Sequence, residues 1–388
     1  MRLVVFSHKP CWSSSASPSG YATDGGFPFQ MSALSELFNQ TTLVVPCSPS
    51  SNEAGEVPLA GHNLSVAPLT PPRGKGVWRK VMLPLWLARN SRLLIKELWE
   101  ADAVHAPIPG DVGTIGLLLA IILRKPLFVR HCGNWFVQQT AAERFWKRLM
   151  ERFAGGNKVM LATGAATEPP SKHNKAISWI FATTLTEQEL KGCFAKRDNS
   201  PGGPARLIIV CRQEREKGTG VVIESLPLIM KDFPRLSLDV AGDGCALDEF
   251  RKTASELGVL DRISFHGKVD HPTVLRLMRQ AHIFCYPTSA SEGFPKVVLE
   301  ALACGLPVVT TRVSSLPQLI GNGSGILIEE TTPAAVADAV TGLLARPDRY
   351  QAMSRQAVET ASQYSLERWR DTIGESLQKA WGAIRTDA

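Results

Sequence analysis

Residues 291–309 of the chain read Ser-Glu-Gly-Phe-Pro-Lys-Val-Val-Leu-Glu-Ala-Leu-Ala-Cys-Gly-Leu-Pro-Val-Val. Pro295 suits the first turn of a helix, because a proline has no N–H that would need a partner there. Gly305 followed by Pro307 is typical of a helix end. Residues 308–311 then have the composition of a short buried strand. The stretch therefore predicts a loop, a helix, a turn and a strand in succession.

Two glutamates of this stretch have different settings. Glu292 falls in the loop before the helix, and Glu300 falls inside the helix, about 7 Å further along its axis at 1.5 Å per residue. Between them lies the helix N-terminus, whose free N–H groups and positive dipole end attract phosphate. A diphosphate bound there would have one acid on each side. The alternative interpretation is an amphipathic helix with solvated acids.

The whole string resembles the signature of the retaining glycosyltransferases of family 4, in which two glutamates separated by seven residues precede Ala-x-Ala-x-Gly-x-Pro-Val. The resemblance implies that Glu292 faces the transferred sugar and that Glu300 holds the ribose hydroxyls of the nucleotide. It also implies donor contacts at the helix N-terminus from Gly293, Phe294, Pro295, Lys296 and Val297.

The composition describes a globular chain. Its 388 residues suffice for two domains, with 44% hydrophobic and 20% charged residues. The net charge of +7 favours anionic partners such as nucleotide phosphates or lipid surfaces. The eight cysteines show neither a Cys-x-x-Cys pair nor zinc-site spacing, which suits a reducing cytosol. The apolar run at 115–123 is too short to cross a bilayer, and residues 1–7 do not read as a signal peptide, so we expect a cytoplasmic protein without a transmembrane helix.

The first half of the chain has the pattern of a nucleotide-binding fold. A strand over 3–6 is followed by a polar loop, the pair Gly25 and Gly26, a helix over about 29–38 and a strand over 42–45. The glycine pair alone is a weak signal, and a plain turn is the alternative. The resemblance implies that the pair lets the backbone approach the donor phosphates and the acceptor.

Two histidines follow predicted parallel strands, and ligands collect beyond the carboxyl ends of such strands. His105 is expected at the end of one strand and His131 at the end of another. A structural role is the alternative for either residue. The resemblance places His131 against the transferred sugar and His105 on the acceptor side.

The second half restarts after a break in composition at 196–204, Lys-Arg-Asp-Asn-Ser-Pro-Gly-Gly-Pro, which predicts a hinge between domains. A buried strand over 206–211 leads to Arg212 and Lys217, whose spacing matches the family's diphosphate clamp. Two cations stabilise the negative charge that builds on a departing nucleoside diphosphate. A solvated basic loop is the alternative. Gly242 and Gly267 end two further strands that resemble those on the family's nucleotide side.

Two segments, 73–86 and 144–153, combine basic and aromatic residues. On a helix, Phe145, Leu149 and Phe153 would share one face. Such segments can rest on an anionic membrane with the apolar face down. The alternative is an ordinary domain helix with its apolar face in the core.

The resemblance implies an α/β protein of the GT-B fold, with two Rossmann-like doubly wound domains facing a cleft. We expect an acceptor-side domain over 1–195, a linker over 196–204, a donor domain over 205–365 and a helix over 366–388 that crosses back to the first domain. Three departures from the family pattern are Cys211, where a glycine is usual, Phe181–Thr184, which replace an Asn-Gly turn, and the long loop over 8–24, which is expected to reshape the acceptor side.

The expected function is retaining transfer of a sugar from a UDP- or GDP-sugar to a carbohydrate or lipid-linked hydroxyl acceptor, in cell-surface polysaccharide or glycolipid synthesis. No carboxylate pair suggests a metal site, so no divalent ion is expected to be required. A peripheral position on the cytoplasmic face of an anionic membrane is a further expectation. The alternatives are a catalytically silent nucleotide-sugar-binding protein and a UDP-sugar epimerase of the same fold. Binding of nucleic acid is disfavoured, because the basic residues are dispersed.

Overall fold

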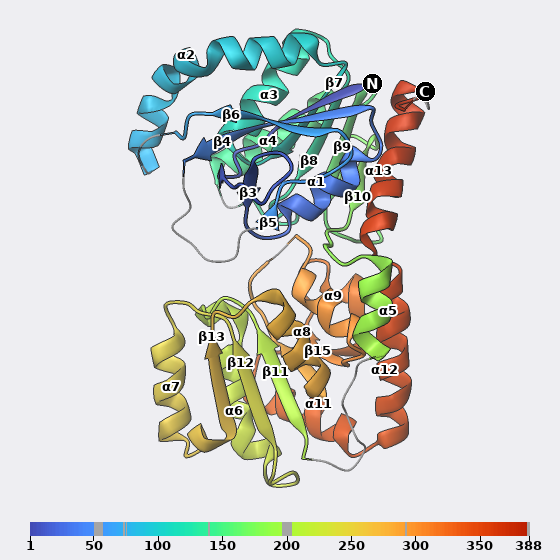
Figure 1. Cartoon of the computed structure of the whole chain (residues 1–388). Coiled ribbons are helices and arrows are strands. Elements are labelled where there is room, and N and C mark those ends of the chain that lie inside the picture. Colours follow the sequence, from blue (N-terminus) through green and yellow to red (C-terminus); the bar gives the residue numbers. More distant parts are fainter. Residues whose placement is uncertain are drawn as a thin grey trace. The chain divides into compact units, whose positions relative to one another are not determined.

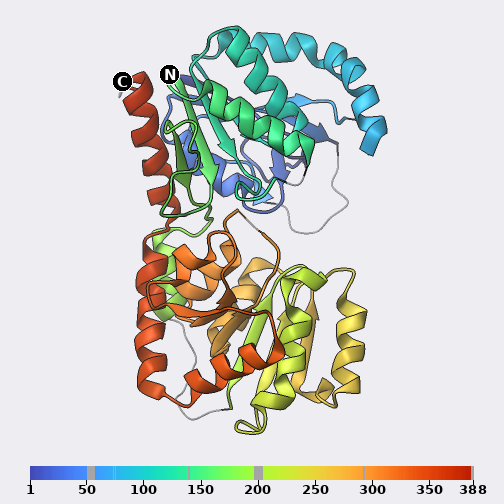
Figure 2. The same cartoon turned by 180° about the vertical axis from the view of Figure 1, so that it is seen from behind.

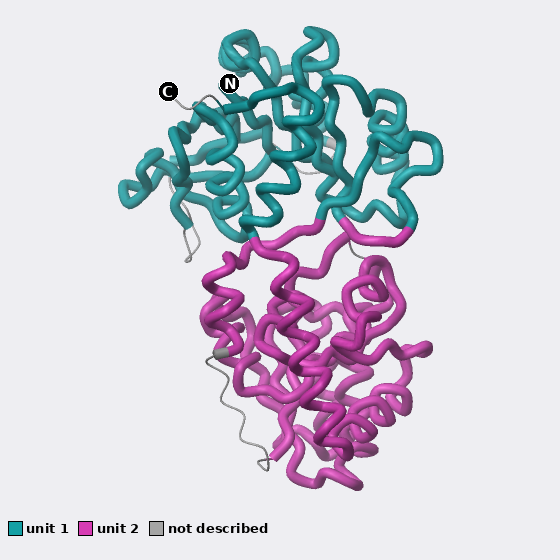
Figure 3. Tube along the Cα trace, turned by 90° about the vertical axis from the view of Figure 1, so that its right-hand side faces the viewer, with its two compact units in different colours: residues 1–163, 168–180, 366–388 teal, residues 164–167, 181–365 magenta. Residues whose placement is uncertain are grey.

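The computed structural model describes residues 1–49, 57–72, 74, 76–138, 140–195, 204–291 and 293–385, without the side chains of residues 76, 77 and 195. The chain forms two compact units (Figure 3). Unit 1 contains Met1–Thr163, Glu168–Ile180 and Leu366–Ala388, and unit 2 contains Gly164–Thr167 and Phe181–Ser365. Most of the predicted hinge, residues 196–203, lies outside the described residues.

The sheet of unit 1 is built around β1, with β4 and then β6 on one side and β7, β8, β9 and β10 on the other. All of these strands run parallel. Three short strands, β2, β3 and β5, extend the sheet from β4. The bounds are β1 Arg2–Phe6, β2 Cys11–Ser13, β3 Tyr21–Thr23, β4 Gln40–Ser48, β5 Val57–Pro58, β6 Leu64–Leu69, β7 Ala103–Ile108, β8 Leu127–His131, β9 Lys158–Thr163 and β10 Ile177–Ile180.

Helices cover both faces of this sheet, as a parallel sheet requires (Figures 1 and 2). The helices α2, α3 and α4 lie on one face, and α1 and α13 lie on the other. Two glycines bring α3 close to the strands: a Cβ on Gly113 would lie 2.2 Å from the carbonyl oxygen of Pro107, and one on Gly116 would meet Phe6. The bounds are α1 Phe27–Ser35, α2 Gly76–Glu100, α3 Asp111–Ile122, α4 Ala141–Phe153 and α13 Leu366–Trp381.

The sheet of unit 2 has the order β13-β12-β11-β14-β15-β16, and every strand is parallel to its neighbours. In chain order this is the 3-2-1-4-5-6 arrangement of doubly wound nucleotide-binding folds. The strand order reverses between β11 and β14. The bounds are β11 Arg206–Val210, β12 Ser237–Ala241, β13 Ile263–Gly267, β14 Ile283–Tyr286, β15 Val308–Thr311 and β16 Gly325–Ile328.

Alternating strand residues of unit 2 face two separate hydrophobic clusters. Ile208 packs in the cluster that includes α5, α8, α9 and α12, whereas Leu207 and Ile209 pack in the cluster that includes α6, α7 and α11. The bounds are α5 Glu187–Ala195, α6 Thr219–Ile229, α7 Leu247–Glu256, α8 His271–Gln280, α9 Lys296–Ala303, α10 Leu316–Ile320, α11 Pro333–Leu344 and α12 Pro347–Ser362, with 3₁₀ turns η1 Arg215–Lys217 and η2 Leu260–Arg262.

The first unit does not extend to residue 195 as the sequence suggested. The chain passes from unit 1 to unit 2 between Ile180 and Phe181, so α5 belongs to unit 2. The physical reason is packing: Leu190 and Cys193 of α5 are buried in the same cluster as Leu302 of α9. The sequence of an amphipathic helix does not show which of two cores the helix covers. The boundary was predicted too late in the chain because the composition break at 196–204 follows α5.

The last helix, α13, belongs to unit 1. Trp369 is fully buried, and the Arg130 guanidinium lies 5.0 Å from the centre of its ring. Arg370 forms an ion pair with Glu36, and the Trp381 indole donates to the backbone oxygen of Asn157 at 2.9 Å. These contacts attach the end of the chain to the unit that contains its beginning. None of the helices within the described residues combines a membrane-spanning length with sufficient hydropathy.

Candidate functional site

The loops that follow β11 and β14 leave the sheet of unit 2 where its strand order reverses. Ligands of doubly wound sheets bind at this position. The backbone oxygen of Glu216, in the first loop, accepts from the Ser289 amide at 2.9 Å and from the Thr288 hydroxyl at 3.0 Å, both in the second loop. The two loops therefore form one connected surface at the carboxyl edge of the sheet.

The buried side chain of Gln213 fixes the first loop by hydrogen bonds. Its side chain is fully buried, and its amide nitrogen donates to the backbone oxygens of Cys211 at 3.0 Å and Ala241 at 3.1 Å. The Thr219 hydroxyl donates to the Gln213 side-chain oxygen at 2.8 Å. A buried polar side chain with all these partners rigidifies its surroundings. The sequence patterns did not identify Gln213, which lies between Arg212 and Lys217 in the chain.

Two glycines allow neighbouring backbones to approach this loop. Gly242 has φ +115°, and a Cβ there would lie 1.8 Å from the Cys211 carbonyl oxygen. Gly218 has φ +88°, and a Cβ there would lie 2.4 Å from the Pro287 carbonyl oxygen. The predicted glycine Gly267 has φ +63° and open space around it, and its carbonyl accepts from the Gly242 amide at 2.8 Å. Gly242 and Gly218 are thus required by close backbone packing at the candidate site.

The two predicted cations have different environments. Arg212 is 74% exposed and pairs with Glu214 at 2.8 Å. Lys217 ends η1 and is only 7% exposed. The Arg212 guanidinium is therefore exposed to solvent, whereas the Lys217 side chain is buried beside the loop.

Two helices begin beside these loops without a side-chain cap. α6 starts after Gly218 and α9 starts after Pro295, and neither preceding residue supplies a capping hydrogen bond. Uncapped N–H groups and the positive helix dipole favour a bound anion. The predicted helix is confirmed, although Pro295 precedes it and Lys296 is its first residue.

The residues around the start of α9 mostly pack or hydrogen-bond within unit 2. Phe294 is 8% exposed and packs near Phe181 and Tyr364, so only its backbone is available to a donor. Val297 packs against the hydrophobic cluster of unit 2 that also contains Phe294. The Gly293 carbonyl accepts from the Ser315 hydroxyl at 2.9 Å. Glu292, the predicted sugar-facing acid, lies outside the described residues.

Glu300 lies inside α9, as predicted, and has an unpredicted partner. Its carboxylate is 12% exposed and lies 3.2 Å from Nε2 of His271, the first residue of α8. The hydrogen bond to Glu300 raises the pKa of His271 above its ordinary value. The pair joins the N-terminal turn of α8 to α9. Nothing in the sequence around His271 points to Glu300, because the pairing depends on how the two helices pack.

In unit 1 the strand order also reverses, between β1 and β7. His8 follows β1, and Gly110 and Asp111 follow β7. A Cβ on Gly110 would lie 2.0 Å from Nδ1 of His8, so the imidazole lies directly on this glycine. Asp111 accepts from Nε of Arg79 at 2.7 Å. Burial first, and then the Arg79 charge, lower the pKa of His8.

The two predicted histidines of unit 1 differ in their positions. His131 ends β8 as expected, and burial lowers its pKa to about 4. Neither of its ring nitrogens makes a well-formed hydrogen bond within the described residues. A Cβ on Gly133 would lie 3.2 Å from its ring, so this glycine keeps the neighbouring space open. His131 is therefore a neutral imidazole at the carboxyl edge of the sheet.

His105 is not at a strand end, which corrects the prediction. It lies within β7, is fully buried and stacks on Phe128 with a centroid distance of 4.2 Å. Its Nδ1 lies 3.0 Å from the Phe128 carbonyl oxygen, and burial lowers its pKa to about 3. The strand continues three residues further than the pattern indicated, so His105 is a core residue.

The remaining glycine prediction concerns Gly25 and Gly26. Gly25 has φ +67° and open space around it, and Gly26 precedes α1 without a capping side chain. This is the geometry of a turn into a helix N-terminus. Across the described ranges, no group of three or more His, Cys, Asp or Glu side chains is placed to hold a metal ion.

Comparison with known proteins agrees with this arrangement. The profile of the family described as Glycosyl transferases group 1 matches residues 194–360. D-inositol 3-phosphate glycosyltransferase of Corynebacterium urealyticum is 31% identical over 313 residues, 76% of this chain and 69% of that protein. Phosphatidyl-myo-inositol mannosyltransferase of Mycobacterium leprae is 33% identical over 160 residues, 40% of this chain and 42% of that protein. The alignments with the first curated relatives span only about two fifths of those relatives' own length.

Among solved structures, HepE of Anabaena in complex with UDP and glucose aligns with a TM-score of 0.71, at 18% identity, over 97% of this chain and 99% of that one. This likeness shows the fold, which is GT-B with two Rossmann-like units. The match to the Corynebacterium protein extends over both halves of the chain and covers more than two thirds of that relative. The chain therefore belongs to the family of group 1 glycosyl transferases.

Proposed function

We propose that this protein is a retaining glycosyltransferase that moves a sugar from a UDP- or GDP-sugar to a hydroxyl acceptor. The observation that carries the proposal is the reversal point of unit 2. There Arg212, Lys217 and the uncapped starts of α6 and α9 border one connected pair of loops. Such a concentration of positive charge and free N–H groups suits a nucleoside diphosphate.

The donor diphosphate would lie over these loops. Arg212 would exchange its exposed contact with Glu214 for a phosphate oxygen, while Lys217 would act from a position that is already buried and needs little reorganisation. As the bond between the sugar C1 and the phosphate oxygen breaks, negative charge grows on that oxygen. Cations and dipoles that are already in place stabilise this charge most effectively. The two cations and the helix dipoles would take the place of the divalent ion that other transferases use. We therefore propose that no divalent ion is required.

The rest of the donor would be held by the two glutamates. Glu300 accepts from the ribose hydroxyls, and its hydrogen bond to His271 fixes the carboxylate orientation. Glu292, by its place in the family motif, orients the transferred sugar. Gly242, Gly267, Gly293, Pro295, Lys296 and the Gly25–Gly26 turn would contribute backbone surface to the donor.

Retention follows if the acceptor attacks from the face that the diphosphate leaves. The new bond forms between C1 and the acceptor oxygen, and the acceptor proton passes to the departing phosphate oxygen. His131, which is neutral because its pKa is lowered to about 4, would contact the sugar by hydrogen bonding without adding charge. His8, beside Asp111 and Arg79, would contact the acceptor.

The acceptor class is proposed from the relatives. The M. leprae relative is named for mannosyl transfer to phosphatidyl-myo-inositol, and the solved structure of WaaG is described as a glycosyltransferase of lipopolysaccharide biosynthesis. We propose a carbohydrate or lipid-linked acceptor, in polysaccharide or glycolipid synthesis. The protein would work in the cytoplasm, at the cytoplasmic face of a membrane.

The test is a thermal-shift panel of UDP, GDP and ADP with the wild type, Arg212→Ala and Glu300→Ala. Lys252→Ala is the matched control, because Lys252 is a 77% exposed cation of α7 in the same unit. We expect stabilisation by one nucleotide, lost in both site variants and kept in the control. Anomeric configuration of the product, followed by NMR, tests retention. Nucleotide binding without transfer to any acceptor would favour the silent binding protein, and epimerised UDP-sugar would favour the epimerase.

A further inference from the structure

The outward side of α2 exposes an unusual amount of apolar surface. Trp78 is 70% exposed and Trp99 is 72% exposed, although tryptophan is usually largely buried. Other large apolar side chains of the same helix are also exposed. The set comprises Trp78, Val81, Leu85, Leu87, Ile95 and Trp99.

Five of these residues, Trp78, Val81, Leu85, Ile95 and Trp99, are called here the α2 stripe, although Ala88 and Arg92 lie on the same side between its first three members and its last two. Their spacing of three, four, ten and four residues keeps them on one side of a 3.6-residue helix. The stripe is about 31 Å long, from the rise of 1.5 Å per residue. The opposite side of α2 is buried in unit 1, through Trp86, Asn90, Leu94, Glu97 and Leu98. The α2 stripe is therefore additional to the face that folding requires.

The charges along the exposed side are positive. Lys80, Arg89, Arg92 and Lys96 are all exposed. The two acids of the helix, Glu97 and Glu100, both pair with Arg2. The exposed side thus carries four cations around an apolar stripe.

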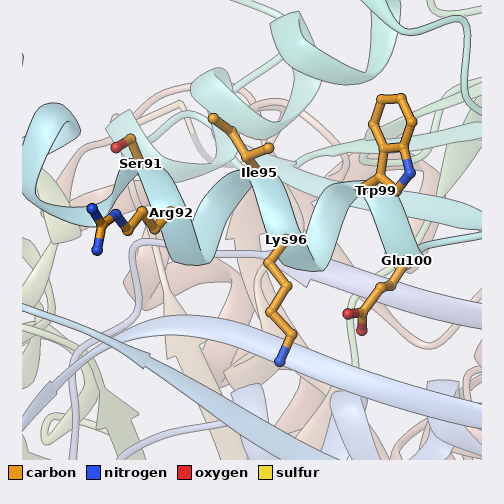
Figure 4. Close-up of a pocket in the computed structure, with 6 residues that line it drawn as sticks. All are labelled: Ser91, Arg92, Ile95, Lys96, Trp99 and Glu100. Carbon is orange, nitrogen blue, oxygen red and sulfur yellow. The ribbon is translucent and has the colours of Figure 1, made fainter.

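The C-terminal half of α2 shows this arrangement in detail (Figure 4). Ile95 and Trp99 project from one side of the helix, Lys96 and Glu100 project from the other, and Arg92 lies between these two directions. Together they border a shallow hollow. An apolar group can enter next to Ile95 and Trp99 while an anionic group meets Arg92 and Lys96, because the Glu100 carboxylate on the Lys96 side is paired with Arg2.

The other basic, aromatic segment has the opposite character. In α4, Leu149 and Phe153 pack against the hydrophobic cluster of unit 1, and only Phe145 of the predicted face is well exposed. The Trp146 indole donates to the Thr114 hydroxyl at 2.9 Å. α4 is an ordinary domain helix, and among the described residues of unit 1 the largest group of exposed apolar side chains on one helix is that of α2.

We infer that the α2 stripe docks this protein on an anionic lipid bilayer. Tryptophans at both ends suit the boundary between headgroups and acyl chains, and lysine and arginine contact lipid phosphates while their stems lie along the apolar surface. A second copy of the chain fits poorly, because pairing the same faces would bring eight cations together. Docking on a bilayer would bring the protein to the membrane that contains the proposed lipid-linked acceptor. The exposure and charge of α2 are observed independently of the transferase activity.

The experiment is flotation with vesicles of phosphatidylglycerol and phosphatidylcholine, compared with phosphatidylcholine alone. We expect the wild type to float with anionic vesicles only. Trp78→Ser combined with Trp99→Ser should lower the vesicle partition coefficient at least tenfold. Replacing Lys80, Arg89, Arg92 and Lys96 by Gln should lower it by about 600-fold, since each cation near an anionic surface is worth roughly fivefold.

Ile122→Ser and Lys252→Gln are the controls. Ile122 is a 71% exposed apolar residue of α3, and Lys252 is a 77% exposed cation of unit 2. Both variants should float as the wild type does. Brominated lipids should quench tryptophan fluorescence of the wild type more than that of the double tryptophan variant. Every α2 variant should keep the wild-type thermal shift with nucleotide, so that loss of docking and loss of the donor site are distinguished.

Three results would overturn the inference. These are a wild type that stays in solution with anionic vesicles, α2 variants that float unchanged, or a stable dimer in light scattering that the α2 variants dissociate. The last result would assign the stripe to self-association.

Discussion

The two sheets share one strand order around their first strands, yet the points where that order reverses are built differently. In unit 2 the loops are tied by backbone and hydroxyl hydrogen bonds through Glu216 and by buried Gln213, and they border Arg212 and Lys217. In unit 1 the same position has the His8 ring on Gly110 and two ion pairs, Arg79 with Asp111 and Lys9 with Asp24. The difference teaches that one topology can carry two cations on tightly hydrogen-bonded loops in unit 2 and cations paired with acids in unit 1, which suits the donor and acceptor roles that we propose for them.

The largest expected effect comes from removing the cations of unit 2. Arg212→Ala and Lys217→Ala should each lower kcat by about 100- to 1000-fold, because each removes a preorganised charge from the departing diphosphate. Steady-state kinetics with the identified donor measure this. Arg212 is exposed, so its variant should keep the wild-type Tm. A tenfold or smaller loss for both variants would remove the contrast between the two reversal points.

The buried histidines predict a second contrast, in acid stability. The pKa of His105 is lowered to about 3 and that of His131 to about 4, both by burial in unit 1. The unfolded chain would take up these protons first, so the stabilisation is full above about pH 6.5 and is lost as the pH falls. From pH 6.5 to pH 5 this amounts to about 2 kcal/mol per histidine.

Hydrogen exchange at pH 7 and pH 5, corrected for intrinsic rates, checks this prediction. Peptides from β7 and β8 should lose more protection than peptides from β11 and β12. The variant His105→Phe, which keeps a ring against Phe128, should lose about half of the pH dependence. Equal losses in both units would contradict the assignment.

A smaller effect is expected at the reversal point of unit 1. Gly110→Ala places a Cβ where the His8 ring lies, and the imidazole must move. We expect the acceptor KM to rise about fivefold while the nucleotide thermal shift stays unchanged, because a contact of this kind contributes roughly 1 kcal/mol. Gly342→Ala, in open space on α11, is the control. A change in donor binding instead would assign His8 to the donor.

The smallest effect concerns His271 and Glu300. Since Glu300 raises the pKa of His271, the pair stabilises the fold fully below pH 6.5, and this contribution disappears as the pH rises through the raised pKa. His271 is 44% exposed, so solvent screening keeps the effect below about 1 kcal/mol. The Tm difference between wild type and His271→Asn, measured at pH 5.5 and pH 8.5, should shrink at the higher pH. In a Glu300→Gln background the difference should not depend on pH.

Much of the proposed donor site could be predicted because its residues are close in sequence. The helix that carries Glu300 and the loop with Arg212 and Lys217 each depend on local rules: proline before a helix, glycine after it, and cations behind a buried strand. The acceptor side could not be predicted in this way. His8 and Gly110 meet only because β1 and β7 are neighbours in the sheet, and no local pattern brings them together.

The helices show the same division. Both 73–86 and 144–153 have basic and aromatic residues at helical spacing, and the sequence determined that each forms an amphipathic helix. Only tertiary packing decided that α4 turns Leu149 and Phe153 inward while α2 leaves two tryptophans exposed. Likewise, the sequence by itself determined two nucleotide-binding sheets and the family motif, but packing decided that α5 joins unit 2 and that His105 is buried. The physical reason is that periodicity and capping act within a few residues of the chain, whereas burial depends on which surfaces the folded sheets have left to cover.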